Sequence, residues 1–318
     1  GTVQFLAMLC PISTGTNYTY IDDITVGYPP ACPTPGDFAT SNAAAHSIDL
    51  SWTSNASEFI VEYGRQDFVQ GTGDSLTVYS NTVTLDNLVM GAKYDAFITA
   101  VCGSDTSHTL FGSFSTGCEA LTENDLPYFE DFESYGTGSS ATINSCWKKG
   151  TNYSSTAYPY PYSTAAINGV RGLYFYSTSS YYSWAAMPAV DENVSMNTLQ
   201  VEFPAKRYSS TSTTYKSVIW VGIAESVDAL YAGGIDTLVT WIDTIDLTPL
   251  AVSAIQNNEV SFANYTGEGR YVVFYAPKLA SGTNNIYIDD INLMLIPSCY
   301  RPTALRVDEI QANVVIVS

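Results

Sequence analysis

Positively charged residues are scarce in this chain. Only 12 Lys and Arg stand against 31 Asp and Glu among its 318 residues, and the formal net charge at pH 7 is −19. Nucleic-acid binding depends on clustered cations that neutralise phosphates, and anionic membrane surfaces attract the same residues. The charge therefore argues against nucleic acid and membrane surfaces as partners, and it fits a soluble extracellular surface or one that binds cations.

Long apolar runs and catalytic motifs are also lacking. No run of about 18 apolar residues exists, so we expect no membrane insertion. The two histidines, His46 and His108, suggest neither a Ser-His-Asp nor a Cys-His arrangement. A Gly-rich phosphate loop and a Cys/His metal spacing are missing too. We therefore expect no catalytic residues and a protein that is not an enzyme.

Helical periodicity is almost absent, whereas residues that favour strands are abundant. Thr, Val and Tyr crowd the sequence, with 24 Tyr in all, and 46% of the residues are hydrophobic. Short runs in which apolar and polar residues alternate recur between turn signals. This pattern predicts an all-β chain large enough for two sandwiches.

A repeat with a constant offset organises the chain. The segment YIDDI at 20–24 recurs at 287–291, an offset of 287 − 20 = 267, and Cys32 recurs as Cys299 at the same offset. We predict a tandem unit of two domains, at 31–118 and 119–297. Residues 1–30 would be the last strands of a preceding copy of the second domain, and 298–318 the start of the next first domain. Because two strands cannot bury an apolar face alone, we expect the native chain to extend beyond both ends.

Residues 31–118 resemble a fibronectin type III domain. The pieces that carry the resemblance follow in the family's order: Leu50-Ser51-Trp52, Val61-Glu62-Tyr63-Gly64, Leu88 to Tyr94, Ala100-Val101-Cys102-Gly103 and Phe114-Ser115-Thr116. The resemblance implies a β-sandwich with Trp52 and Tyr94 in its core.

Residues 119–297 resemble the cleaved-adhesin family, the haemagglutinin-type modules of gingipain-like proteins, and the related MAM modules. The matching pieces are Phe132-Glu133-Ser134, Val221-Gly222-Ile223, residues 260–267 and residues 287–291. The pairing of the two domain types resembles secreted repeat proteins of Bacteroidota. These resemblances imply a jelly-roll β-sandwich, an extracellular or cell-surface location, adhesion, and structural calcium.

Acidic residues gather at both ends of the second domain. Glu130, Asp131 and Glu133 lie near its start, and Asp289 and Asp290 lie at its end. They would meet if the first and last strands pair, and adjacent carboxylates repel unless a proton or a cation lies between them. Ca²⁺ accepts irregular sets of oxygen ligands, and the resemblance to the adhesin modules implies structural calcium near these motifs. The motif match implies Glu133 and Asp290 as its ligands, with Asp131 or Asp289 beside them.

Two other interpretations of these carboxylates stay open. They can accept main-chain hydrogen bonds at strand ends, or form an acid pair for glycoside cleavage. The acidic motif recurs at Asp22 and Asp23, which suits a scaffold element better than an active site.

Six cysteines without a metal spacing predict disulfides in a secreted chain. In the fibronectin type III sandwich that the resemblance implies, the first strand begins at the pole where the sixth strand ends, so we pair Cys32 with Cys102. Cys118 leaves the last strand and Cys146 lies early in the jelly roll, so we pair them across the domain junction. The alternative is that some cysteines are free buried thiols.

Two aromatic runs, at 158–162 and 181–184, suggest a binding surface. Pro159 and Pro161 argue against a central strand, so we predict a loop for the first run. Exposed rings stack on sugars or protein surfaces, which makes Tyr160, Tyr162 and Trp184 candidate binding residues. The alternative is a loop that folds its rings onto the sheet.

Three Asp-Ser/Thr-aliphatic triplets resemble the O-glycosylation signal of Bacteroidota. The resemblance implies attachment at Ser75, Thr237 and Thr244. Such attachment is relevant only if the chain is secreted.

Three functions are compatible with these observations. The leading one is a calcium-stabilised, non-catalytic adhesin of tandem modules that binds a glycan or a surface protein of a host or neighbouring cell. The second is a structural stalk or filament that self-associates into fibres. The third is a set of accessory modules attached to a distant secreted peptidase or glycosidase.

Overall fold

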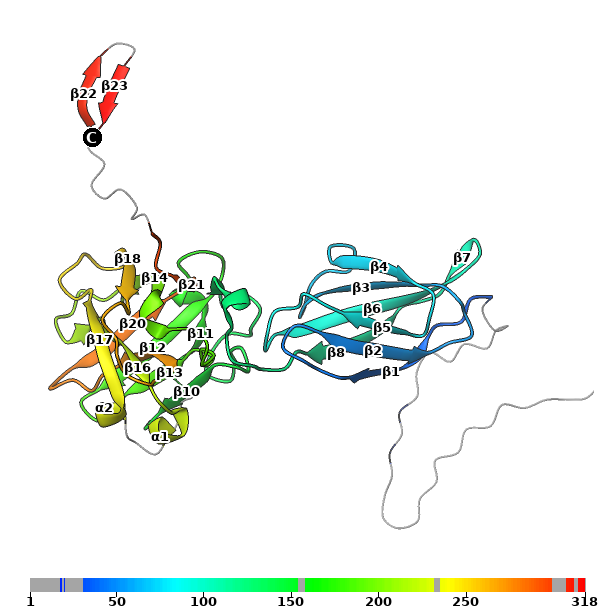
Figure 1. Cartoon of the computed structure of the whole chain (residues 1–318), viewed down its shortest axis with the longest axis horizontal. Coiled ribbons are helices and arrows are strands. Elements are labelled where there is room, and N and C mark those ends of the chain that lie inside the picture. The colour runs from blue at the N-terminus through cyan, green and yellow to red at the C-terminus, as the bar shows by residue number, and fades with distance from the viewer. Residues whose placement is uncertain are drawn as a thin grey trace, which may run out of the picture.

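The computed structural model describes residues 31–153, 158–231 and 235–298, together with Tyr18, Tyr20 and two strands near the C-terminus. Within these ranges the chain forms two β-sandwiches that lie end to end along the long axis (Figure 1). The predicted all-β fold class is therefore confirmed. No helix in the described part of the chain has both the length and the apolar character needed to cross a membrane.

The first sandwich packs a three-stranded sheet against a five-stranded sheet. The smaller sheet has the order β1-β2-β5, and the larger one runs β4-β3-β6, with β7 and β8 both paired to β6. The strands are Gly36–Ser41 (β1), Ile48–Thr53 (β2), Phe59–Arg65 (β3), Asp74–Val78 (β4), Thr82–Leu85 (β5), Lys93–Cys102 (β6), Asp105–Thr106 (β7) and Leu110–Ser115 (β8).

Alternation along these strands builds a single core between the two sheets. In β2, Ile48, Leu50 and Trp52 are buried, whereas the residues between them are partly exposed. Trp52 packs edge-on against Phe59, with ring centroids 5.2 Å apart. Tyr94 is also buried, so the predicted core positions of Trp52 and Tyr94 are confirmed.

The second sandwich packs an eight-stranded sheet against a five-stranded sheet. The larger sheet runs β11-β12-β20-β14-β21-β9, with β15 paired to β20 and β18 paired to β14, and the smaller runs β10-β13-β19-β16-β17. The strands are Tyr128–Glu130 (β9), Lys148–Thr151 (β10), Tyr160–Tyr162 (β11), Gly172–Thr178 (β12), Ser183–Ala186 (β13), Leu199–Arg207 (β14), Tyr215–Lys216 (β15), Val218–Ala224 (β16), Val239–Asp246 (β17), Ile255–Ser261 (β18), Tyr271–Ala276 (β19), Thr283–Ile288 (β20) and Ile291–Leu295 (β21).

Short helical turns and a terminal hairpin complete the described elements. The turns are η1 (Glu123–Asp125), η2 (Ser163–Ala165), η3 (Met196–Thr198), α1 (Val227–Tyr231) and α2 (Ile235–Leu238). Near the C-terminus β22 (Val307–Gln311) pairs antiparallel with β23 (Val314–Val317), as β1 does with β2. The predicted partial copies at 1–30 and 298–318 otherwise fall almost wholly outside the described residues, and so do Cys10 and Cys299.

In the large sheet, β20 and β21 follow each other directly and are separated only by Asp289 and Asp290. β20 and β21 both pair with β14, and Asp290 between them has a positive φ of 43°, which breaks the regular extension. β9 pairs with β21, with Glu130 opposite Ile291. The first and last strands of the second sandwich therefore pair, and this brings its two acidic ends together.

The described residues contain two disulfides, and both predicted pairings are confirmed. Cys32 and Cys102 are joined within the first sandwich, with an S–S distance of 2.13 Å. Cys118 and Cys146 are joined at 2.18 Å between the end of the first sandwich and the start of the second. Disulfides persist in oxidising compartments, so the pair fits an extracellular or otherwise oxidising location.

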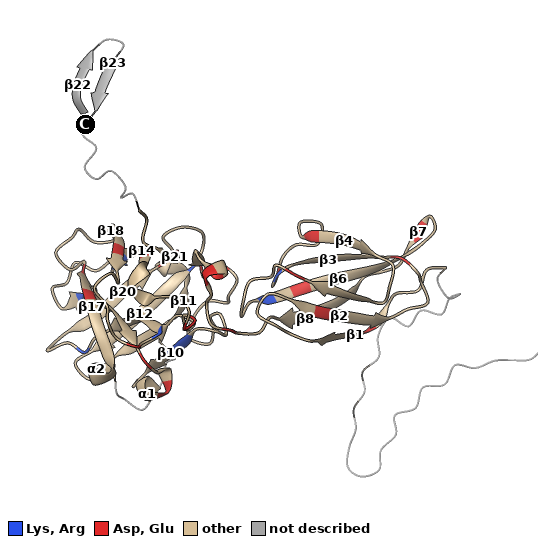
Figure 2. Cartoon of the chain, viewed as in Figure 1, with Lys and Arg blue, Asp and Glu red and all other residues tan. Residues whose placement is uncertain are grey.

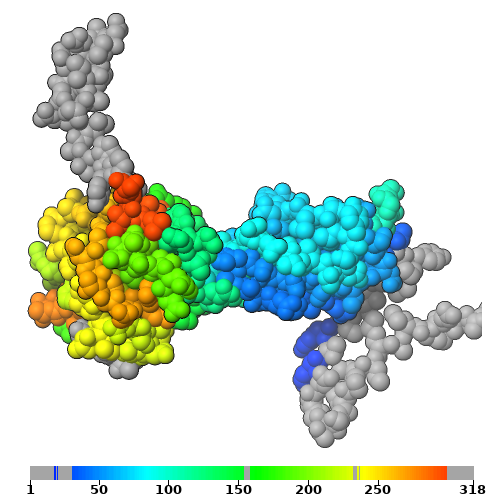
Figure 3. All heavy atoms as spheres, in the orientation of Figure 1, coloured from blue at the N-terminus to red at the C-terminus, as the bar shows by residue number. Residues whose placement is uncertain are grey.

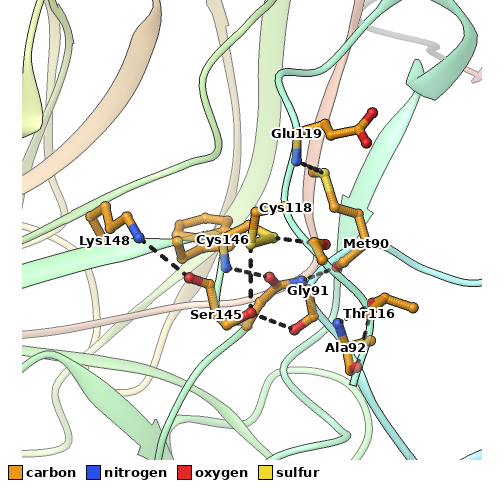
Figure 4. Close-up of a disulfide and its surroundings, with 12 residues drawn as sticks. Met90, Gly91, Ala92, Thr116, Cys118, Glu119, Ser145, Cys146 and Lys148 are labelled. Carbon is orange, nitrogen blue, oxygen red and sulfur yellow. Dashed lines mark hydrogen bonds between the residues drawn. A yellow bond between two sulfur atoms is a disulfide. The ribbon is translucent and has the colours of Figure 1, made fainter. Parts of the chain in front are cut away.

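Hydrogen bonds and apolar contacts reinforce the junction around Cys118–Cys146 (Figure 4). The Asn144 amide donates to the Met90 carbonyl at 2.8 Å, and the Ser145 N–H donates to the Gly91 carbonyl at 3.2 Å. Met90, which belongs to the first sandwich, is buried in the core of the second. The two sandwiches meet at a narrow waist (Figure 3). A covalent bond, hydrogen bonds and a shared apolar contact therefore fix this waist, where a bare linker would let the domains swing.

Candidate functional site

The acidic residues of the second sandwich converge on one segment, 167–171. Glu133 accepts hydrogen bonds from the main-chain N–H groups of Val170 and Arg171, both at 2.9 Å. Asp289 accepts from the N–H groups of Ile167 and Asn168, at 2.8 and 3.3 Å. These two carboxylates therefore hold opposite ends of the same segment.

The other two predicted ligands are engaged in a similar way. Asp131 accepts from the Glu133 N–H at 3.0 Å, and Asp290 accepts from the Asn168 side-chain amide. Burial raises the pKa of Asp289 to about 7, although the N–H groups that it accepts from act in the opposite direction. All four predicted ligands therefore accept hydrogen bonds from N–H groups of the protein.

These contacts match the interpretation of the carboxylates as main-chain acceptors. Ca²⁺ takes roughly six to eight oxygen ligands, and no group of three or more His, Cys, Asp or Glu residues among the described positions is placed to hold a metal ion. The main-chain N–H groups of segment 167–171 contact only one oxygen each of Glu133 and Asp289, which are Oε1 and Oδ2. Calcium binding by these carboxylates stays a prediction.

Melting in the presence and absence of Ca²⁺ tests that prediction. An ion that binds only the folded state stabilises by mass action, by about 2.7 kcal/mol at a hundredfold excess over its Kd. Bound calcium therefore predicts a melting temperature that falls when EDTA is added, and a difference that Asp290→Asn abolishes. Identical melting curves with calcium and with EDTA would leave hydrogen bonding as the sole role of these carboxylates.

A larger feature of the second sandwich is a continuous cluster of ten tyrosines, which we call the tyrosine array. Neighbouring rings have centroid separations from 4.5 to 6.3 Å. Its members come from β11, β12, β15 and β20 and from the segments that flank β10, β12 and β14: Tyr153, Tyr158, Tyr160, Tyr162, Tyr174, Tyr176, Tyr181, Tyr208, Tyr215 and Tyr287.

Strand alternation places the array on the outer face of the large sheet. In β12, Leu173 and Phe175 enter the core, so Tyr174 and Tyr176 point to the other face. In β20 the core residues are Ile286 and Ile288, and Tyr287 lies between them. Eight of the ten rings are partly exposed; the exceptions are Tyr160, at 9%, and Tyr287, at 2%. The array is therefore a surface and not part of the core.

Polar groups lie between and below the rings. The Tyr174 hydroxyl donates to the side-chain oxygen of Asn285, which is 2% exposed. The Asn285 amide nitrogen is buried and has no hydrogen-bond partner among the described residues. Burial raises the pKa of Tyr158, Tyr174 and Tyr287. These phenols therefore stay neutral at ordinary pH and keep a proton to donate.

Two of the three predicted aromatic binding residues belong to the array. Tyr160 and Tyr162 lie in β11, which pairs with β12 at the edge of the large sheet. The loop prediction for this run is therefore wrong. An edge strand leaves one side unpaired, and for that reason it tolerates Pro161 where a central strand would not.

The third predicted residue, Trp184, is buried at 1% exposure, so its proposed role as an exposed binding ring is wrong. It lies on the outer face of the small sheet, in a cluster with Leu230, and packs against Tyr231 with ring centroids 5.0 Å apart. The turns α1 and α2 cover this part of the sheet, and the sequence pattern did not predict any helix there.

The three predicted O-glycosylation positions are accessible. Ser75 in β4, Thr237 in α2 and Thr244 in β17 are all exposed. Attachment at these residues stays a prediction.

Comparisons with known proteins add little to this description. The sequence matches no protein-family model and no curated protein. Among solved structures, a fibronectin type III domain of human collagen XX is 18% identical and covers 29% of this chain and 100% of its own, with a TM-score of 0.25. The FN5 domain of Drosophila Lar is 14% identical, with 28% and 99% coverage and a TM-score of 0.24.

One similar structure extends over both sandwiches. It belongs to a study of carbohydrate-binding modules from the β-sandwich superfamily, is 13% identical, and covers 82% of this chain and 98% of its own, with a TM-score of 0.36. Because these scores are all below 0.5, the fold described above rests on the strands and their register alone.

Proposed function

We propose that this chain is part of a non-catalytic extracellular adhesin, and that its second sandwich binds a glycan on the tyrosine array. The observation that carries the proposal is the position of the ten rings. They lie on an outer sheet face, where they contribute nothing to the core between the sheets. Ordinary surface packing does not require a continuous cluster of this kind, and extended aromatic surfaces often mark binding sites.

Tyrosine has the chemistry that such a ligand needs. A sugar ring presents C–H groups on its faces and hydroxyls on its rim, and a tyrosine offers an apolar ring face together with a polar hydroxyl. The unpartnered Asn285 amide supplies one more donor beneath the rings. An unsatisfied buried donor costs about 1–3 kcal/mol. A ligand that places an acceptor between the rings recovers part of this cost by accepting a hydrogen bond from Asn285.

Other ligand classes fit the array less well. Stacked aromatic rings also bind nucleic-acid bases, but a net charge of −19 opposes binding of a phosphate backbone. A surface protein of a host or neighbouring cell remains the alternative partner of the adhesin. The junction at Cys118–Cys146 would project either kind of binding surface at a fixed angle.

Truncation of rings in the array tests the proposal. Tyr208 and Tyr215, whose ring centroids are 5.0 Å apart, are partly exposed at one end of the array. We expect Tyr208→Ala and Tyr215→Ala each to weaken binding to a glycan about tenfold, which corresponds to roughly 1.4 kcal/mol. The measurement is affinity electrophoresis or calorimetry against a panel of neutral and acidic polysaccharides.

The matched control is Tyr79→Ala, because Tyr79 is 74% exposed and lies in the first sandwich. Its removal should leave the affinity unchanged. If wild-type protein binds none of the polysaccharides, or if all three variants bind equally well, the proposed function is wrong.

A structural stalk is the second candidate, and one observation favours it. The disulfide, the Asn144–Met90 hydrogen bond and the buried Met90 side chain together stiffen the junction. End-to-end assembly into fibres, without binding to any glycan, would support this function instead.

A further inference from the structure

The tyrosine array is built from parts of the chain that lack carboxylates. Six of the ten rings come from β11, β12, β15 and β20, and none of these strands contains Asp or Glu. Yet 31 of the 318 residues of the chain are acidic, or about one in ten. In Figure 2 the two central strands of the array, β12 and β20, carry neither acidic nor basic residues. Carboxylates begin directly after β20, at Asp289 and Asp290, and Asp289 is buried.

Cations, by contrast, lie within the array. Lys206 places its ammonium group 5.8 Å from the centre of the Tyr287 ring, a cation–π contact. The same group donates to the main-chain carbonyls of Thr164 and Ala166, both at 2.9 Å. Because these carbonyls carry no net charge, the positive charge of Lys206 is not neutralised by them.

A second ammonium group, that of Lys149, lies beside β11. Lys149 donates to the carbonyl of Pro159 at 2.7 Å, between the array residues Tyr158 and Tyr160. Burial lowers the pKa of Lys149 to about 8, so the group is still mostly protonated at neutral pH. The array thus combines two cations, in a protein whose overall charge is −19.

We propose that the ligand of the tyrosine array is an acidic glycan, one that carries carboxylate or sulfate groups. This rests on the proposed function, that the array binds a glycan at all. The Coulomb energy of an anion is favourable near Lys206 and Lys149, and the strands β11, β12, β15 and β20 that carry rings of the array contain no acidic residue. Elsewhere the acidic surface repels a polyanion, so binding is confined to the array.

Matched pairs of polymers test this inference, since each pair shares its sugar backbone and differs in charge. Polygalacturonate and its methyl ester test carboxylate, and dextran sulfate and dextran test sulfate. We expect the anionic member of at least one pair to bind wild-type protein tenfold or more tightly than its neutral partner. The affinity should decline as salt is added, because salt screens exposed charges.

Charge variants make the test specific to the array. Lys206→Gln should weaken binding of the anionic polymer about tenfold, in line with the loss of a charge-assisted contact. Lys206→Arg, which keeps the charge and the donors, should restore most of the affinity and also shows whether the site tolerates substitution. Lys93→Gln makes the same change of charge at an exposed position of the first sandwich and should have no effect.

The outcomes separate the two proposals. Equal affinity for the anionic and neutral members of both pairs, or equal affinity of Lys206→Gln and Lys93→Gln, overturns the acidic-glycan inference but leaves glycan binding intact. Failure of wild-type protein to bind any of the four polymers also overturns the inference. The proposed function is tested separately, by the panel of neutral and acidic polysaccharides and by the affinities of Tyr208→Ala and Tyr215→Ala.

Discussion

Loss of the Cys32–Cys102 disulfide should destabilise the first sandwich strongly. The bond closes a loop with a sequence separation of 70. The loop-closure entropy that it removes from the unfolded chain corresponds to about 4 kcal/mol. A domain of this size has a total stability on the order of 5–15 kcal/mol. The Cys32→Ala/Cys102→Ala double variant should therefore lose a large part of its stability, and its melting temperature should fall by roughly 20 °C.

Scanning calorimetry measures this effect as a shift in the unfolding transition of the first sandwich. The control is Cys118→Ala/Cys146→Ala. That disulfide joins the two sandwiches at their junction, so its loss should lower the transition of the first sandwich much less. A first transition unchanged in the Cys32/Cys102 variant would show that the core of the first sandwich is stable without its covalent bond.

The second large effect concerns pH and the buried carboxyl of Glu130. This side chain is 3% exposed and accepts hydrogen bonds from the Phe132 N–H and the Tyr135 hydroxyl, each at 2.9 Å. Burial raises the pKa of Glu130 from its ordinary 4.5 to about 7. The folded state therefore binds this proton more tightly than the unfolded chain, and folding is most favourable where the group is protonated.

The contribution of Glu130 to the stability of the folded state decreases as the pH rises. Stability from Glu130 is fully present below about pH 4.5, and it declines as the pH rises towards 7. The difference amounts to about 3 kcal/mol, at roughly 1.4 kcal/mol per pKa unit. Asp289, whose pKa burial also raises to about 7, acts in the same direction. The second sandwich should therefore melt at a lower temperature at pH 8 than at pH 5.

Glu130→Gln isolates the contribution of this residue. The amide cannot ionise, so the variant should show a shallower pH dependence and should be more stable than the wild-type protein at pH 8. Glu259→Gln, at an exposed position of β18 in the same domain, should keep the wild-type slope. If Glu130→Gln also keeps that slope, Glu130 is not responsible for the pH dependence.

The fold and the disulfides could be predicted from sequence because both follow from local rules. The resemblance to a fibronectin type III domain implied that Trp52 and Tyr94 lie in the core, and the topology of such a domain brought Cys32 to Cys102. These predictions required only the order of strands in a known sandwich type, which the spacing of short motifs carries well.

The candidate site was harder to predict, because strands far apart in sequence assemble it. Tyr174, Tyr208 and Tyr287 become neighbours only through the sheet order that sets β12 beside β20 and β20 beside β14. The usable signal was a tyrosine between two core residues, as at Tyr174 and Tyr287. The alternation that reveals such an outward position does not reveal whether a covering element hides it, and for that reason Trp184 was misjudged.

A titration that locates the ligand tests glycan binding by the tyrosine array most directly. Tyrosine rings labelled with ¹³C would be observed by NMR while a polysaccharide fragment that binds wild-type protein is added. We predict shifts at Tyr162, Tyr208 and Tyr215, on the outer face of the large sheet, and none at Tyr79. Shifts confined to the first sandwich, or to Tyr231 beside Trp184 on the small sheet, would contradict binding at the array.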